Sequence, residues 1–149
     1  MTSRIVVGVD NSSDALRALE WALRIAGPLG AHVRAVHAYA PPGVYFPYST
    51  HTAEEMHDTL EKQARAEAEQ ALEEVLASIQ APEGVTVEPA VIRDRPAEAL
   101  LTEAREADML VVGSRGHGGF AGLLLGSVSQ QCVHHATCPV VVVPPPERS

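Results

Sequence analysis

The sequence predicts an α/β fold in which helices cover both faces of an open parallel sheet. Short runs of β-branched residues alternate along the chain with segments whose apolar residues recur at helical spacing, and this alternation is typical of a parallel sheet. The first run, at 4–9, is apolar on both faces, which favours a central, doubly covered strand. The length of 149 residues fits one domain, and the 46% of hydrophobic residues excludes intrinsic disorder.

The first half of the chain predicts two strands around one helix. The strand at 4–9 is followed by Asp10-Asn11-Ser12-Ser13, a cluster of N-cap residues that begins a helix ending at about 27–28. A second strand is expected at 33–39. The loop after it, from Pro41 to Thr52, holds or adjoins four of the six aromatic residues. It is either packed down by its own side chains or a lid or protein-binding surface.

The second half predicts a long acidic helix and then a βαβαβ run. The helix at 53–80 carries eight acidic side chains against two basic ones, and we interpret its acidic face as a solvated surface. In the strand at 85–92, Glu88 and Pro89 indicate a sheet edge, because proline cannot donate to a ladder. Pro96 fits the first turn of a helix reaching about residue 107. A strand at 109–112, a helix at 127–136 and a strand at Val140–Val143 complete a sheet of expected order 3-2-1-4-5. The domain is expected to span 1–146, with 147–149 as a tail.

Charge and cysteine content narrow the function classes. The formal net charge is −8, which argues against non-specific binding to nucleic acid and against an anionic membrane surface. No apolar run is long enough for an export signal or a membrane span. With two cysteines, the chain is expected to be cytoplasmic with reduced thiols.

Two segments with ligand-binding character follow the first and fourth strands. Ligands of open parallel sheets bind at the carboxyl ends of the strands, where the chain places Gly8 to Ser12 and a run of five glycines among ten residues beginning at Gly113. Glycine amides, together with the free N–H groups of the helix that begins at Ser127, would suit an anion such as a triphosphate. Arg115 and His117 could supplement these donors.

The spacing of these glycines resembles that of a known family. Gly113, Gly116, Gly126 and Ser127 match, without a gap, the pattern Gly, two residues, Gly, nine residues, Gly-Ser of nucleotide-binding universal stress proteins. Residues 6–10 resemble that family's first strand and 138–143 its last, so the resemblance covers essentially the whole chain. It implies a Rossmann-like, adenine nucleotide alpha hydrolase-like fold that binds ATP, and a regulatory role in stress resistance or growth arrest. Asn11 stands where many members carry glycine.

The resemblance also implies roles for individual residues. Asp10 would contact the nucleotide, holding the ribose hydroxyls or assisting a Mg²⁺ or Mn²⁺ ion bound mainly through the phosphates, so no metal site is expected from the protein alone. The implied ligand set comprises Gly8, Asp10 and Ala38 beside adenine and ribose, Val112 and Gly113 flanking them, and Gly116, Gly126, Ser127, Val128 and Ser129 around the phosphates. The remaining loop candidates are Ser114, Arg115, His117, Gly118 and Gly119.

Other patterns in the sequence point to different functions but are incomplete. The run 116–121 fits G-x-G-x-x-A, but it follows the fourth strand and lacks the acidic residue that a dinucleotide site requires. Cys132, His134, His135 and Cys138 match no common zinc spacing, and a buried Cys132 explains them more simply. The competing function is a nucleotide-free interaction module. No lysine lies near the glycine loop, so slow ATP turnover at most is expected.

Self-association is predicted at the last strand. Val140–Val143 carries no charge and is expected at a sheet edge, where a bare apolar strand tends to pair with another chain. A two-fold homodimer is the simplest closed arrangement.

Overall fold

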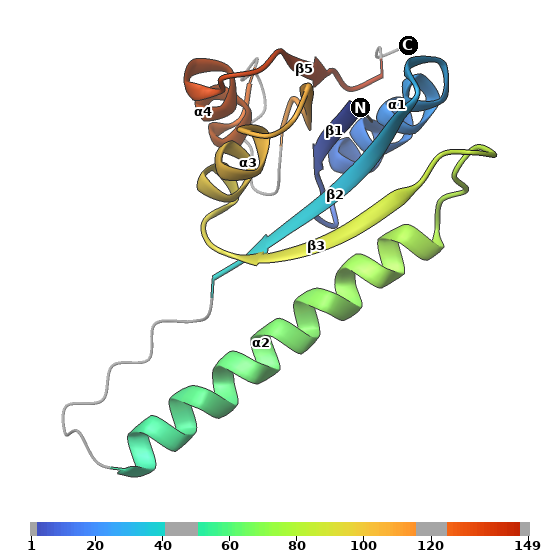
Figure 1. Cartoon of the computed structure of the whole chain (residues 1–149). Coiled ribbons are helices and arrows are strands. Elements are labelled where there is room, and N and C mark those ends of the chain that lie inside the picture. Colours follow the sequence, from blue (N-terminus) through green and yellow to red (C-terminus); the bar gives the residue numbers. More distant parts are fainter. Residues whose placement is uncertain (1–2, 41–50, 116–124, 147–149) are drawn as a thin grey trace.

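The computed structural model describes residues 3–40, 51–115 and 125–146, with only the backbone for 51–54. Five parallel strands form one sheet of order β3-β2-β1-β4-β5, which confirms the predicted fold class and strand order (Figure 1). The elements are β1 (Ser3–Gly8), α1 (Ser13–Leu29), β2 (Ala31–Tyr39), α2 (His51–Ala77), β3 (Val87–Arg93), α3 (Pro96–Ala104), β4 (Met109–Gly113), α4 (Ser127–His135) and β5 (Val140–Val143).

Two apolar layers enclose the sheet. On one face, alanines and leucines of α1 and Leu72 of α2 pack with alternate residues of β1, β2 and β4. On the other face, Leu100 of α3 and Cys132 of α4 pack with the intervening residues of the same strands. The central strands are therefore buried on both sides, as the continuous apolar runs predict. Figure 1 shows α1 and α2 on the side opposite α3 and α4.

Several helix ends differ from the sequence-based expectation. The first helix continues through Pro28 to Leu29 and stops at Gly30, which takes φ 63 and donates its N–H to the carbonyls of Ala26 and Gly27. A proline in the last turn removes only one helical donor, whereas a left-handed glycine ends the helix outright. The third helix ends at Ala104 instead of residue 107, because the three amides that follow bond three residues back, in a tighter turn.

Helix α2 begins and ends earlier than predicted, at His51 and Ala77. It stops where the Ser78 hydroxyl donates to the Val75 carbonyl at 2.6 Å, a local bond that competes with the helical pattern. Figure 1 shows its first half running beyond the ends of β2 and β3.

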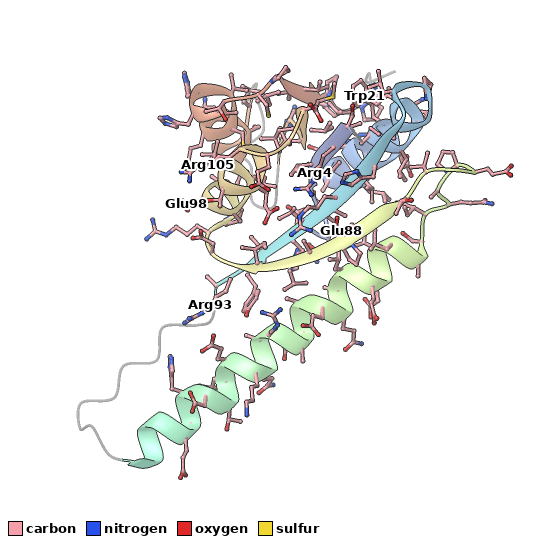
Figure 2. All side chains as sticks on the ribbon, viewed as in Figure 1. Arg4, Trp21, Glu88, Arg93, Glu98 and Arg105 are labelled. Carbon is pink, nitrogen blue, oxygen red and sulfur yellow. The ribbon has the colours of Figure 1, made fainter. Side chains whose placement is uncertain are left out.

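An ion pair joins α2 to the carboxyl end of β3. Arg93, the last residue of β3 (Figure 2), pairs with Glu61 of α2 at 3.2 Å. Of the loop between β2 and α2, residues 41–50 lie outside the described residues, so its proposed role stays a prediction.

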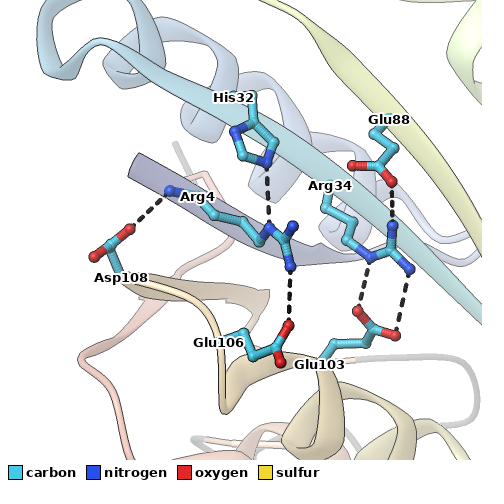
Figure 3. Close-up of polar contacts among 7 residues, drawn as sticks. All are labelled: Arg4, His32, Arg34, Glu88, Glu103, Glu106 and Asp108. Atoms are coloured by element: carbon cyan, nitrogen blue, oxygen red, sulfur yellow. Dashed lines mark hydrogen bonds and ion pairs between the residues drawn. The ribbon is translucent and has the colours of Figure 1, made fainter. Parts of the chain in front are cut away.

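An ion-pair cluster connects strands β1, β2 and β3 to the end of helix α3 (Figure 3). It lies toward the amino ends of the strands, whereas the predicted ligand segments follow their carboxyl ends. Arg34 of β2 donates from Nε to Glu103 at 2.7 Å and also pairs with Glu88 of β3. The hydrogen bond to Glu103 is the main reason that the pKa of Arg34 lies above its usual value. Arg4 of β1 reaches Glu106, just after α3, at 3.6 Å. The cluster thus fixes β1, β2 and β3 against one helix.

Candidate functional site

The loop after β1 is held by its own polar side chains. The Asp10 carboxylate accepts the Ser12 N–H at 2.8 Å, and the Ser12 hydroxyl accepts the Ala15 N–H at 3.1 Å, capping α1. Both contacts follow from short polar residues placed just before a helix. Asp10 therefore lies in a defined turn at the carboxyl end of β1.

The last residue of β4, Gly113, packs directly on the first turn of α1. A Cβ atom built on Gly113 would lie 2.8 Å from the backbone oxygen of Asp14 in α1, so only glycine lets the two segments approach this closely. Strands β1 and β4 are neighbours, with Val7 opposite Val111. The two predicted ligand segments therefore lie side by side at one sheet edge. Gly113 also has a packing role that the spacing of the glycines alone does not reveal.

Ser114 closes the glycine loop at its base. Its carbonyl accepts the N–H of Gly126 at 2.6 Å and the hydroxyl of Ser129 at 3.0 Å, while its own N–H donates to Val143 of β5 at 3.1 Å. Ser129 is 3% exposed, and its hydroxyl also lies 3.0 Å from the Gly126 carbonyl. Sequence reasoning assigned Ser129 only to the phosphates. In the structure its hydroxyl holds together the two ends of the loop, a contact with a backbone acceptor that no spacing pattern reveals.

Hydrogen-bond donors gather where α4 begins. Gly126 is the N-cap and offers no side-chain acceptor, so the first amides of α4, at Ser127, Val128 and Ser129, have no hydrogen-bond partner within the described ranges and would suit an anion. The Ser114 hydroxyl and Arg115 Nε are buried and lack a hydrogen-bond partner within the described ranges. Buried polar groups normally have a partner. Unused donors on both sides of the loop therefore match an anionic ligand.

The other predicted contacts lie around this edge or outside the described residues. Ala38 is near the end of β2 and Val112 near the end of β4. A Cβ atom on Gly8, the last residue of β1, would lie 2.8 Å from a Leu100 methyl carbon, so this glycine accommodates α3. Four loop candidates, Gly116, His117, Gly118 and Gly119, lie outside the described residues.

In the cysteine and histidine group at the end of α4, the cysteines pack in the apolar layer under α3 and α4, whereas His134 and His135 are exposed. Cys132 is 0% exposed, and burial raises the pKa of its thiol to about 11. Burial also raises the pKa of Cys138, which packs against the same apolar cluster. The interpretation of Cys132 as a small buried residue is therefore confirmed. Within the described ranges, no three side chains of His, Cys, Asp or Glu are grouped as metal ligands, and no helix is long and apolar enough to cross a membrane.

Comparison with known proteins places this geometry in one family. The model of the universal stress protein family matches residues 1–144. A universal stress protein of Mycolicibacterium smegmatis is 36% identical over 139 residues, which cover 93% of this chain and 47% of that protein. The chain spans about half the length of the curated relatives that it matches.

Solved structures agree with the sequence matches. The universal stress protein UspA from Lactobacillus plantarum is 26% identical, with a TM-score of 0.64 over 95% of this chain and 97% of that one. A universal stress protein solved in complex with cAMP is 28% identical, with a TM-score of 0.59 over 95% of this chain and 96% of that one. The chain belongs to the universal stress protein family.

Proposed function

We propose that this chain binds ATP at the carboxyl edge of the sheet, between the Asp10 turn and the loop from Gly113 to Ser127. Adenine and ribose would lie beside Gly8, Asp10, Ala38 and Val112, and the phosphates beside the start of α4. Mg²⁺ or Mn²⁺ would be held mainly by phosphate oxygens, with Asp10 as the nearby carboxylate, in keeping with the small number of protein ligands that Mg²⁺ usually takes.

The observation that carries this proposal is the set of unused donors around the loop. The first amides of α4, the buried Ser114 hydroxyl and the buried Arg115 Nε lack partners within the described ranges. A triphosphate has enough acceptor oxygens for all of them and interacts favourably with the helix dipole. The relative solved with cAMP supports a nucleotide as the ligand class.

ATP would act here as a ligand that sets the state of the protein in a cytoplasmic stress response. Phosphoryl transfer needs a positioned nucleophile and several charge stabilisers. Between residues 108 and 126 the sequence contains only two basic side chains, Arg115 and His117, and no lysine. We therefore expect slow hydrolysis at most.

The test is calorimetric titration with Mg·ATP of the wild-type chain and of Ser127→Asp. Ser127 is exposed at the first position of α4, where a carboxylate favours the helix but repels a phosphate. Gln130→Glu adds the same charge at an exposed position one turn further along and serves as the control. We expect binding to be lost in Ser127→Asp, at a stability no lower than that of the wild type, and kept in Gln130→Glu. Equal binding by all three proteins would place the phosphates elsewhere.

Two other ligand states are outcomes of the same experiment. Tighter binding of cAMP than of ATP would make a cyclic nucleotide the ligand, as the cAMP-bound relative suggests. Absence of binding to either, from protein free of co-purified nucleotide, would favour a nucleotide-free interaction module, with the loop Pro41 to Thr52 as its first candidate surface.

We further propose a two-fold homodimer through β5. This strand lies at the sheet edge, and the carbonyls of Pro139 and Val143 face β4, so by alternation Val140 and Val142 direct their backbone groups outward. Trp21 of α1 (Figure 2) and Val141 of β5 are half-buried, and both pack against the apolar layer between α1 and the sheet. Sedimentation velocity should give a dimer for the wild type and a monomer for Val142→Pro, which lacks an outward N–H. A wild-type monomer at micromolar concentration would refute the dimer.

A further inference from the structure

A histidine side chain extends the attachment between β1 and β2 beyond their last ladder pair, Gly8 opposite Val36. The N–H of Val9 donates to the Val36 carbonyl at 2.8 Å. The carbonyl of the same residue, Val9, lies 2.8 Å from Nδ1 of His37. Both backbone polar groups of Val9 are thus bound to β2, one by its backbone and one by a side chain.

The carbonyl acceptor determines that Nδ1 of His37 carries a proton. A carbonyl oxygen has no proton to donate, so Nδ1 of His37 must carry the hydrogen of this bond. The neutral ring is therefore the Nδ1–H tautomer. A doubly protonated ring would keep the same bond, because both of its nitrogens are donors.

The bond matters because Val9 directly precedes Asp10. With both polar groups of Val9 held, the direction in which the chain enters the Asp10 turn is set, and the Ser12 N–H fixes the carboxylate from the other side at 2.8 Å. Val9 itself is 5% exposed and packs in the apolar layer under α1. We propose that His37 is a positioning residue for Asp10 in nucleotide binding, a role that rests on the proposed function.

Three substitutions of His37 distinguish the effect of its hydrogen bond from the effect of its side-chain volume. His37→Ala removes the donor, His37→Asn keeps an N–H donor at the δ position, and His37→Gln moves it to the ε position. The matched control is His32→Ala at the other end of β2. His32 Nε2 accepts a hydrogen bond from Arg4 Nε at 3.2 Å (Figure 3), at the beginning of β1, whereas Asp10 follows the end of that strand. Comparing the two alanine variants removes any general effect of a weakened β2.

We expect His37→Ala and His37→Gln to weaken Mg·ATP binding about five- to tenfold, the effect of one lost hydrogen bond. His37→Asn should restore most of the affinity, and His32→Ala should leave it unchanged. If Asp10 holds the ribose, the preference for ATP over 2′-deoxy-ATP should shrink in His37→Ala and in Asp10→Ala. The double variant should then lose no further preference, a result that general destabilisation would not produce.

The outcomes distinguish this inference from the proposed function. Nitrogen NMR of the histidine rings should show the Nδ1–H tautomer for His37, and an Nε2–H tautomer would overturn the contact without any nucleotide present. Wild-type ATP binding that is unchanged in His37→Ala, or lost equally in the Asn variant, would overturn the positioning role alone. Failure of the wild type to bind ATP would overturn the proposed function, and the positioning role with it.

Discussion

Replacing each of three glycines by alanine should change the free energy of unfolding by different amounts, because their surroundings differ. At Gly113 the new Cβ would lie 2.8 Å from the Asp14 backbone oxygen. At Gly27, inside α1, its nearest neighbour would be a Val85 methyl carbon at 3.8 Å, an ordinary contact. At Gly30 there is open space, but φ is +63.

The magnitudes follow from these distances and angles. Overpacking costs about 1–3 kcal/mol, and removing glycine from a strand recovers about 0.5–1 kcal/mol, so Gly113→Ala should lower the free energy of unfolding by about 1–2 kcal/mol. Gly27→Ala should change it by no more than about 0.5 kcal/mol, because the helix propensity gained by alanine is opposed by the contact of its Cβ with the ring of Pro28, the next residue of α1. Gly30→Ala should lower it by about 1–2 kcal/mol, the cost of left-handed backbone.

Urea denaturation followed by circular dichroism measures all three variants against the wild type. A Gly113→Ala protein as stable as Gly27→Ala, with an unchanged denaturant slope, would refute the close approach of β4 to α1. A displaced α1 in Gly113→Ala would also weaken the proposed nucleotide binding indirectly. That is why Ser127→Asp, which leaves the backbone in place, is the sharper test of the phosphate site.

Three further outcomes follow from single contacts. Glu103→Ala should cost about 2 kcal/mol of unfolding free energy, because Arg34 and Glu103 are only 20% and 17% exposed; a loss that vanishes in moderate salt would contradict this. Ser12→Ala should cost about 1 kcal/mol through the lost N-cap, and an unchanged urea midpoint would mean that the cap contributes nothing. Cys138 should react with a thiol reagent before Cys132, whose thiol is fully buried with a pKa of about 11; equal rates in the folded protein would contradict the burial.

One edge of the sheet was predictable from composition. Pro89 marks β3 as an edge, and the structure pairs β3 with β2 alone among the described strands. The apolar runs of β1 and β4 favour cover on both faces, but β5 is equally apolar at the other edge, where its valines pack into both apolar layers. The hydrogen-bonding constraint at Pro89 acts within one strand, so a single sequence reveals it, whereas apolar composition does not separate β5 from the central strands.

Contacts between side chains and distant backbone groups were not predictable in this way. Ser129 reaches the Ser114 carbonyl, and His37 reaches the Val9 carbonyl across 28 positions in the sequence. A carbonyl is present at every residue, so the acceptor leaves no mark in the sequence. Only the register of β1 against β2, and the position of the start of α4 beside Ser114, bring these donors to their partners.

The glycine spacing therefore combines two requirements that sequence alone does not separate. Gly113 is required by the approach of α1, and Gly126 donates its amide to close the loop on Ser114. A chain could retain both glycines to keep this loop closed even without a nucleotide, so the spacing is evidence of loop geometry before it is evidence of a ligand. The donors at α4, Ser114 and Arg115 that lack partners within the described ranges are the independent argument, because they take no part in the described contacts that close the loop. A charge placed at Ser127 tests those donors while the loop geometry stays the same.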